Sequence, residues 1–174
     1  MTVYFEDVEV GEVRRFGTYE VTESEVIEFA ERYDPQPFHV DPDAAGERWG
    51  GLIASGWHTA SMTMRLLVDG LLSTASTAGA KGVDEVRWTR PVRPGDVLSA
   101  RTTVLGKELG DPDDDYGDVR IRVETLDDDD EVVMRFRSRV MFDRRPDADD
   151  RDRPADVGVR GGADEFESEP DSED

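Results

Sequence analysis

The sequence predicts a domain of the α+β class, in which an antiparallel sheet packs around one long buried helix. Residues 57–68 read as a helix with apolar side chains on nearly all sides, which is typical of a buried helix. The segments after it alternate apolar and polar residues, most regularly over residues 119–123 and 134–142, and this pattern predicts half-buried antiparallel strands. At 174 residues, the chain has about the length of one domain.

Alternation and a helix-start signal predict the first two elements. Residues 13–21 are expected to form a strand. The spacing of Thr22 and Glu25 is that of a capping box, which predicts the start of a helix. Because a residue before proline avoids the helical region, this helix is expected to end at Asp34, before Pro35.

Two further helices are predicted next. Asp41 and Pro42 suit the N-cap and the first position of a short helix over residues 42–48. A glycine-containing approach then leads into the long helix of residues 57–68, which Gly70 is expected to close.

The part of the body that follows the long helix is predicted to be strands and loops. Residues 83–88 and 97–105 are expected as strands, separated by a turn-rich crossover at residues 91–96. The two alternating segments described above are expected to be joined by a hairpin loop at residues 127–130, and the acidic run 111–115 forms another loop.

The chain divides into a patterned body, residues 1–143, and a tail over residues 144–174 that is rich in Asp, Glu, Arg, Gly and Pro. Such a tail cannot build a core, so a disordered, solvating extension is favoured over a docking segment. No apolar run is long enough to cross a bilayer, and the N-terminus has neither a basic flank nor a hydrophobic region. We therefore expect a soluble, cytoplasmic protein with no membrane partner.

Composition excludes several kinds of site. The absence of cysteine excludes disulfides, thiolate metal sites and a cysteine nucleophile, and two histidines, His39 and His58, are too few for a histidine-rich metal site. The formal charge is -21, and only two of the 21 basic residues, Lys81 and Lys107, are lysines. This composition resembles that of cytoplasmic proteins from salt-accumulating halophiles. We expect no metal and no nucleic-acid partner.

The acidic composition also predicts a salt-dependent stability. Repulsion between like charges destabilises a compact chain, and at 1 M salt the screening length falls to about 3 Å, so this repulsion largely vanishes. The melting temperature should therefore fall when the protein is dialysed from molar salt into dilute buffer. Thermal melts in both buffers measure this, and an unchanged melting temperature would contradict the halophilic interpretation.

A carboxylate and an imidazole are held close together in residues 34–39, which read Asp-Pro-Gln-Pro-Phe-His. Each proline fixes its own φ and keeps the preceding residue out of the helical region. The backbone between Asp34 and His39 is therefore preorganised, as proton-transfer catalysis requires. At a helix C-terminus, the helix dipole is expected to raise the pKa of Asp34. The alternative is that both side chains only cap helices and support a turn.

Three motifs together resemble a known family. The Asp-Pro-Gln-Pro-Phe-His segment is followed by Ala45, by Ser-Gly-Trp-His-Thr at residues 55–59 and by Pro-Val-Arg-Pro-Gly-Asp at residues 91–96. In this combination, residues 5–142 resemble the MaoC-like dehydratases, the family of (R)-specific enoyl-CoA hydratases. The resemblance implies a hot-dog fold, an antiparallel sheet wrapped around a long central helix. It also implies a homodimer or higher homo-oligomer that joins sheets edge to edge.

The resemblance implies a hydro-lyase that adds water to a trans-2-enoyl-CoA or removes it from a 3-hydroxyacyl-CoA. Asp34 and His39 would supply acid and base, with His39 activating water and Asp34 handling the α-proton. Gly56, at the start of the long helix, is the oxyanion-hole candidate. Ser61 matches a family serine that hydrogen-bonds near the pair, or else it permits close packing. Coenzyme A enters as part of the substrate, and no separate cofactor is implied.

Some residues and functions have more than one interpretation. His58 is interpreted as a packing or capping histidine. Five arginines on two adjacent strands could bind coenzyme A phosphates or pair with acids across strands: Arg120, Arg122, Arg135, Arg137 and Arg139. Tyr33, Gln36 and Phe38 stand where the family pattern has Gly, Asn and an aliphatic residue, so the acyl pocket is altered. A hot-dog thioesterase and a non-catalytic acyl-CoA-binding module are the alternatives.

Overall fold

The computed structural model describes residues 2–111 and 114–146. From residue 147 onward, the predicted tail lies outside the described residues, and its interpretation stays a prediction. In those described ranges, no helix is long and apolar enough to cross a membrane. The elements in chain order are η1 (Phe5–Asp7), β1 (Val13–Glu20), α1 (Glu23–Tyr33), α2 (Pro37–Val40), α3 (Pro42–Trp49), α4 (Gly56–Leu67), η2 (Val68–Leu72), β2 (Thr77–Trp88), β3 (Val97–Leu109), β4 (Tyr116–Leu126) and β5 (Val132–Asp143).

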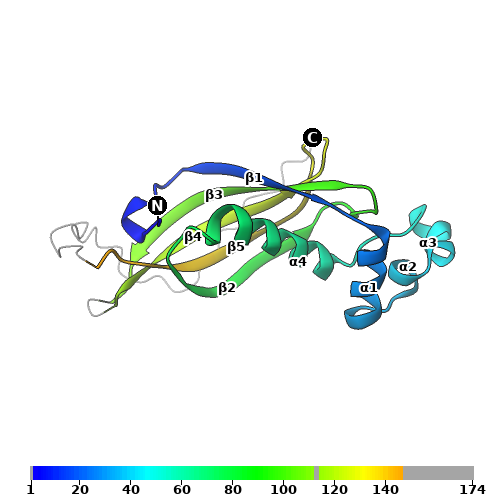
Figure 1. Ribbon diagram of the computed structural model, residues 1–174, viewed down its shortest axis with the longest axis horizontal. Helices are drawn as coiled ribbons and strands as arrows, with labels where there is room; N and C mark the ends of the chain where they lie inside the picture. The colour runs from blue at the N-terminus through cyan, green and yellow to red at the C-terminus, as the bar shows by residue number, and fades with distance from the viewer. Residues whose placement is uncertain (1, 112–113, 147–174) are drawn as a thin grey trace.

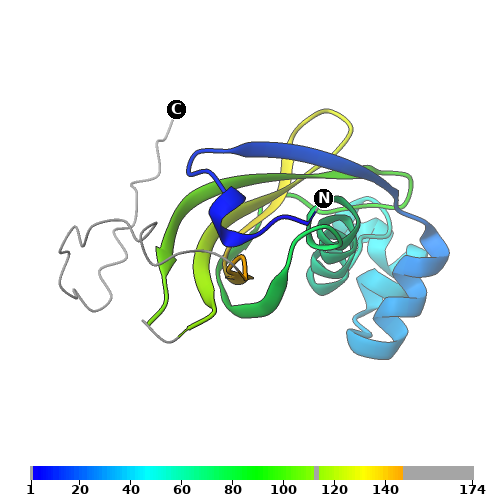
Figure 2. The same cartoon turned by 60° about the vertical axis from the view of Figure 1, so that its left-hand side comes forward.

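The five strands form one antiparallel sheet in the order β1-β3-β4-β5-β2. Figure 1 shows α4 lying along one face of this sheet, and Figure 2 shows the strands curving around it. The short helices α1, α2 and α3 gather near one end of α4 (Figure 1). This is the hot-dog arrangement that the sequence predicts.

The predicted caps are confirmed. Thr22 Oγ1 accepts a hydrogen bond from the Glu25 amide at 3.4 Å and donates one to Glu25 Oε2 at 2.7 Å, at the start of α1. Asp41 Oδ1 accepts from the amides of Asp43 and Ala44, at 2.9 and 3.4 Å, at the start of α3. These bonds satisfy amide donors that a helix leaves free in its first turn.

A one-turn helix, α2, carries His39, where the sequence predicted only a stiffened connection between two helices. Pro37 occupies the first helical position, where its fixed φ suits a helix and its missing N–H costs nothing. A second short helix therefore intervenes between α1 and α3, and it turns the imidazole inward. His39 is 5% exposed.

The strand β2 begins at Thr77, six residues before the predicted start. Its first half reads Thr-Ala-Gly-Ala-Lys-Gly, which lacks the apolar alternation that marks a strand. Pairing with β5 orders it instead, with Ala80 opposite Val140 and Gly82 opposite Arg139. The strand lies at the edge of the sheet and is mostly exposed on both faces.

The helix α4 is buried on one face only, so the prediction of an all-round buried helix is wrong for a single copy of the chain. Its buried residues include Met62 and Leu66, whereas Trp57, Met64 and Val68 are 61%, 47% and 41% exposed. These exposed residues follow one another at helical spacing and form an apolar stripe along the outer side of α4 and the first residue of η2.

Gly70 does not close the long helix as predicted. The chain continues from α4 into the π-helical turn η2, which contains Gly70. A Cβ at this position would lie 2.1 Å from the ring of Phe16, so the glycine permits close packing between η2 and β1.

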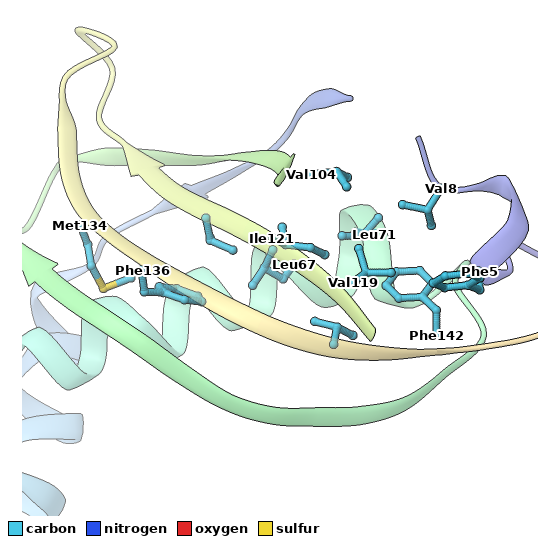
Figure 3. Packing of buried hydrophobic residues seen from close by; sticks show 12 residues of the cluster. Phe5, Val8, Leu67, Leu71, Val104, Val119, Ile121, Met134, Phe136 and Phe142 are labelled. Carbon is cyan, nitrogen blue, oxygen red and sulfur yellow. The ribbon is translucent and has the colours of Figure 1, made fainter. Parts of the chain in front are cut away.

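Two clusters of buried hydrophobic residues hold α4 against the sheet. Leu67 and Leu71 pack against residues of the inner sheet face such as Val119, Ile121 and Phe136 (Figure 3). A second cluster joins the middle of α4 to β1, α1 and β3 through Met62, Leu66, Val26, Leu98 and their neighbours. The core therefore holds the middle and the C-terminal end of α4 against the sheet.

The five aligned arginines lie on the sheet face that points away from α4. Arg120 stands opposite Arg139 and Arg122 opposite Arg137, while the residues between them point into the core. Arg120 lies 3.8 Å from Glu108, and Arg137 lies 3.4 Å from Glu85 on the neighbouring strand β2. Pairing with acids across strands, one of the two interpretations, is thus observed for two members of the group.

Candidate active site

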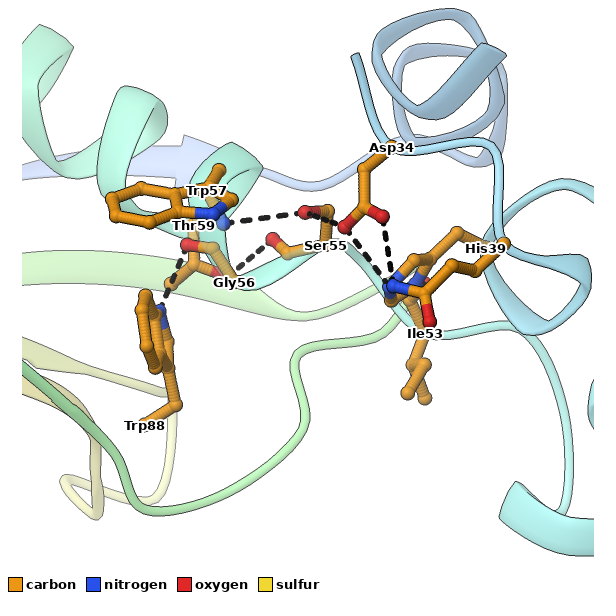
Figure 4. A network of polar contacts seen from close by, with 9 residues as sticks. Asp34, His39, Ile53, Ser55, Gly56, Trp57, Thr59 and Trp88 are labelled. Atoms are coloured by element: carbon orange, nitrogen blue, oxygen red, sulfur yellow. Dashed lines mark hydrogen bonds and ion pairs between the residues drawn. The ribbon is translucent and has the colours of Figure 1, made fainter.

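The structure brings Asp34 and His39 together. Asp34 is the C-cap of α1 and His39 lies on α2, and the distance from His39 Nε2 to Asp34 Oδ2 is 3.5 Å (Figure 4). The imidazole is almost fully buried, while the carboxylate is partly exposed to a surface cleft. A carboxylate and an imidazole that lie side by side in the wall of a cleft can exchange protons with a bound molecule.

The tautomer of neutral His39 follows from its second hydrogen bond. His39 Nδ1 lies 2.8 Å from the carbonyl oxygen of Ile53. A carbonyl only accepts, so Nδ1 carries the hydrogen and Nε2 carries the lone pair. That lone pair faces Asp34 at the cleft, where it can accept a proton.

Both carboxylate oxygens of Asp34 accept hydrogen bonds. Ser55 Oγ donates to Oδ2 at 2.6 Å, and Gln36 Nε2 donates to Oδ1 at 2.8 Å. The Ser55 bond, followed by the Gln36 bond and the nearby His39, lowers the pKa of Asp34 against the opposing effect of desolvation. The expectation that the α1 dipole raises this pKa is wrong, because hydrogen bonds that stabilise the charged form outweigh it.

Ser55 therefore has the supporting contact that the sequence assigned to Ser61. Ser55 is fully buried and is also the N-cap of α4, where its Oγ accepts from the Trp57 amide at 3.3 Å. Ser61 is exposed, and its Oγ donates to the Trp57 carbonyl of its own helix at 2.9 Å. The structure does not bring Ser61 to the pair. The N-cap preference for serine was the signal in the sequence that could have pointed to Ser55.

The pair opens into a surface cleft of about 450 Å³. Its wall includes Ile53, Ala54, Ser55 and Gly56 as well as the catalytic candidates. This segment is anchored from two sides, since the Ile53 amide donates to the Phe38 carbonyl at 3.3 Å and the Ala54 amide donates to the Val92 carbonyl at 2.8 Å. The approach to α4 is thus held in register with α2.

Gly56 lies at the cleft as predicted. It is the first residue of α4, and within the described ranges its amide has no acceptor, so it can donate to a bound oxygen. The Trp88 indole N–H donates to the Gly56 carbonyl at 2.9 Å. A Cβ on Gly56 would lie 2.7 Å from the Trp88 ring, so only glycine fits this close approach.

The arginine that lines the cleft is not one of the five considered for coenzyme A. Arg90 lies on its wall, 3.2 Å from Asp127 and 3.6 Å from Glu131. None of the five aligned arginines contributes to the cleft. Among residues 2–111 and 114–146, no group of three or more His, Asp or Glu side chains is arranged to hold a metal ion.

The comparisons with known proteins show the family of this chain. A family model described as MaoC like domain matches residues 6–125. The chain belongs to the MaoC-like family. The MaoC-like dehydratase from Rhodospirillum rubrum is 40% identical, with a TM-score of 0.73, and the match covers 83% of this chain and 99% of that one.

Two further proteins resemble this MaoC-like chain. The uncharacterized protein YdeM of Bacillus subtilis is 31% identical over 101 residues, which cover 57% of this chain and 71% of YdeM. The R-hydratase PhaJ1 from Pseudomonas aeruginosa has a TM-score of 0.68 at 23% identity, over 83% of this chain and 88% of that one. The second likeness shows the shared fold.

His58, the other histidine of the MaoC-like domain, is packed between α1 and α4. It is 6% exposed, and its ring stacks on Phe29 with centroids 4.6 Å apart. Its Nδ1 is buried without a hydrogen-bond partner among the described residues. Burial lowers the pKa of His58, and the nearby Glu25 opposes this shift. The interpretation as a packing histidine agrees with this placement.

The buried His58 predicts a loss of stability in mild acid. In the unfolded chain, His58 binds a proton as the pH falls through the ordinary histidine pKa of about 6.5. In the folded chain, His58 binds this proton only at a lower pH, because burial lowers its pKa. The free energy of unfolding therefore falls as the pH decreases through this window, by at most about 1.4 kcal/mol per pH unit from this one proton. Denaturant unfolding of the wild type and of His58→Gln at pH 7.5 and 5.5 measures it, with the exposed-site variant Val10→Ala as the control. The prediction is wrong if His58→Gln retains the full pH dependence.

Proposed function

We propose that the protein hydrates trans-2-enoyl-CoA thioesters, or dehydrates the corresponding 3-hydroxyacyl-CoA. The observation that carries the proposal is that a carboxylate, an imidazole lone pair and a free helix N-terminal amide face one cleft. Hydration of a conjugated thioester needs these three groups: two that move protons and one that stabilises the enolate oxygen. Membership of the MaoC-like family supports hydratase or dehydratase chemistry in general.

In the hydration direction, His39 Nε2 accepts a proton from a water molecule as its oxygen attacks the β-carbon. The electron pair of the double bond moves toward the thioester carbonyl, and the Gly56 amide donates to the resulting enolate oxygen. The proton passes from Nε2 across 3.5 Å to Asp34 Oδ2 and from there to the α-carbon. The cycle returns neutral His39 and ionised Asp34, and the reverse sequence removes water.

The lowered pKa of Asp34 suits the dehydration direction. There, an ionised carboxylate takes the α-proton, and Ser55 and Gln36 keep Asp34 ionised at rest. The proton then returns through His39 to the departing hydroxyl group. Asp34 thus handles the α-proton in both directions, and His39 handles the water.

One assay separates this function from a thioesterase and from a binding module. The protein is incubated with crotonyl-CoA in high salt, and both the enoyl absorbance and the free thiol are followed. Loss of absorbance without thiol supports the hydratase. Release of thiol would assign a thioesterase, and tight binding with neither change would assign a non-catalytic module.

We further propose that the protein is a homodimer joined through β2. This edge strand leaves a row of backbone donors and acceptors that a second copy can pair with, and its Val83 is 50% exposed. Met64 and Val68, in the C-terminal half of α4 and at the start of η2, give a second copy more exposed apolar surface to cover.

Interrupting the β2 edge should dissociate the dimer. Val83→Pro removes a backbone donor and disfavours strand pairing, so light scattering should show a shift from a dimeric to a monomeric mass. Val10→Lys, which changes a valine that is 59% exposed in another part of the chain, serves as the control and should stay dimeric. A wild-type protein with a monomeric mass would contradict the proposal.

A further inference from the structure

All three tryptophans of the chain line the cleft, and they lie on two sides of the reacting groups. Trp57 and Trp88 lie on the far side of Gly56 from Asp34 and His39 (Figure 4). Trp49 lies near His39, because its ring packs 6.1 Å from the Phe38 ring, which in turn packs 4.5 Å from the imidazole. The cleft therefore has an aromatic wall at each end.

This arrangement gives a bound thioester a direction. When the carbonyl oxygen accepts from the Gly56 amide, the α- and β-carbons must point toward Asp34 and His39 for proton transfer. The sulfur is attached to the other side of the same carbonyl carbon. The carrier arm must therefore leave the site on the side of Trp57 and Trp88, while the acyl group extends toward Trp49.

We propose that Trp57 and Trp88 form a binding surface for the carrier arm of the thioester, and that Trp49 contacts its acyl group. The inference rests on the proposed hydratase function and extends it to how the substrate is held. Coenzyme A offers two kinds of planar group that stack on indole rings: the amides of its pantetheine arm and its adenine ring. Stacking of a base on an aromatic side chain contributes about 1–3 kcal/mol.

The two indoles are suited to this task because one of them is fixed. Trp88 is held by its N–H bond to the Gly56 carbonyl, and Trp57 stands at 78° to it with ring centroids 5.4 Å apart. Both rings remain open to solvent, at 61% for Trp57 and 45% for Trp88. A preorganised, exposed aromatic pair beside a cleft is typical of ligand recognition, and core packing does not require it.

The test uses Trp57, since its exposed ring can be removed without opening the core. Trp57→Ala should raise KM for crotonyl-CoA by about 5- to 150-fold, the range that corresponds to 1–3 kcal/mol, with kcat nearly unchanged. KM for the N-acetylcysteamine thioester of crotonate, which lacks most of the arm, should not change. Crotonyl-pantetheine separates the two sources of stacking: a retained effect assigns the amides, and a lost effect assigns the adenine. Trp57→Phe should recover part of the affinity.

Direct binding keeps this inference separate from the proposed reaction. Coenzyme A alone should quench the tryptophan fluorescence of the wild-type protein, with a weaker Kd for Trp57→Ala and an unchanged Kd for the control Val10→Ala. An inactive wild-type protein that still shows this quenching would overturn the hydratase but support the binding surface. Equal KM increases for crotonyl-CoA and the N-acetylcysteamine thioester would overturn the inference. A Trp57→Ala protein whose oligomeric mass changes in light scattering, while its Kd for coenzyme A stays the same, would overturn the inference as well. Trp57 would then be an interface residue.

Discussion

Replacing Asp34 by Asn is expected to lower kcat for crotonyl-CoA hydration by about 10²- to 10⁴-fold, with little change in KM. The amide has nearly the shape of the carboxylate and can still accept the hydrogen bond that Ser55 donates at 2.6 Å. It cannot carry a proton between His39 and the α-carbon. Steady-state kinetics across a range of crotonyl-CoA concentrations measure both parameters.

The fold should survive this substitution, which separates a loss of chemistry from a loss of structure. Asp34 is the partly exposed C-cap of α1, so the melting temperature of the Asn variant should differ from that of the wild type by only a few degrees. His39→Gln should cost a similar factor in kcat. Because the two groups would act on one proton, the double variant should be scarcely slower than the slower single variant. Losses that multiply would mean that Asp34 and His39 work independently.

The sequence predicted the site best where local rules decide the structure. The capping signals at Thr22 and Asp41 place two helix starts correctly, and α1 ends at Tyr33 with Asp34 as its C-cap, directly before Pro35. These boundaries place Asp34 and His39 in one short connection, since each boundary depends on contacts within a few residues. The unpredicted helix α2 and the Ile53 carbonyl then orient the imidazole. The first turn of α4 at Gly56 was predictable for the same reason.

Elements that depend on distant partners were not predictable to the same degree. The first half of β2 is a strand because β5 pairs with it, as with Gly82 opposite Arg139, and its own composition does not favour a strand. The exposed side of α4, including Met64, was interpreted as core because hydrophobicity does not tell a face that packs within the chain from one that is left open. The sequence pattern predicts that this segment is a helix, but it does not predict which of its faces packs against the sheet.

The hydrogen bonds that support the Asp34–His39 pair show the same limit. The motif that resembles the MaoC-like family pointed to Ser61, yet the contact to Asp34 comes from Ser55, 21 residues away along the chain. The helix dipole at Asp34 was a local feature and suggested a raised pKa. The lowered pKa arises mainly from the Ser55 donor, which only the folded structure brings to the carboxylate, and Gln36, two residues from Asp34, adds to it.

Ser55 is therefore the residue whose loss should affect the site most among those that do not touch the substrate. Ser55→Ala removes the donor that contributes most to the lowered pKa of Asp34, and it frees the carboxylate to rotate away from His39. We expect kcat/KM to fall by about 10- to 100-fold, as for a lost hydrogen bond to a charged group. A carbon-detected NMR titration should show the Asp34 pKa rising in the variant.

The pH dependence of stability gives Ser55 a second, independent test. A depressed pKa in the folded state contributes stability above about pH 3.9, the ordinary value for Asp, and this contribution is lost as the pH falls through the folded pKa. Ser55→Ala should therefore lose more unfolding free energy at pH 7 than near pH 3. The loss of the α4 N-cap, about 1 kcal/mol, is the same at both pH values. Ser55→Thr keeps the hydroxyl and should keep most of the activity. A folded Thr variant that is as slow as the Ala variant would show that the hydroxyl does not position Asp34.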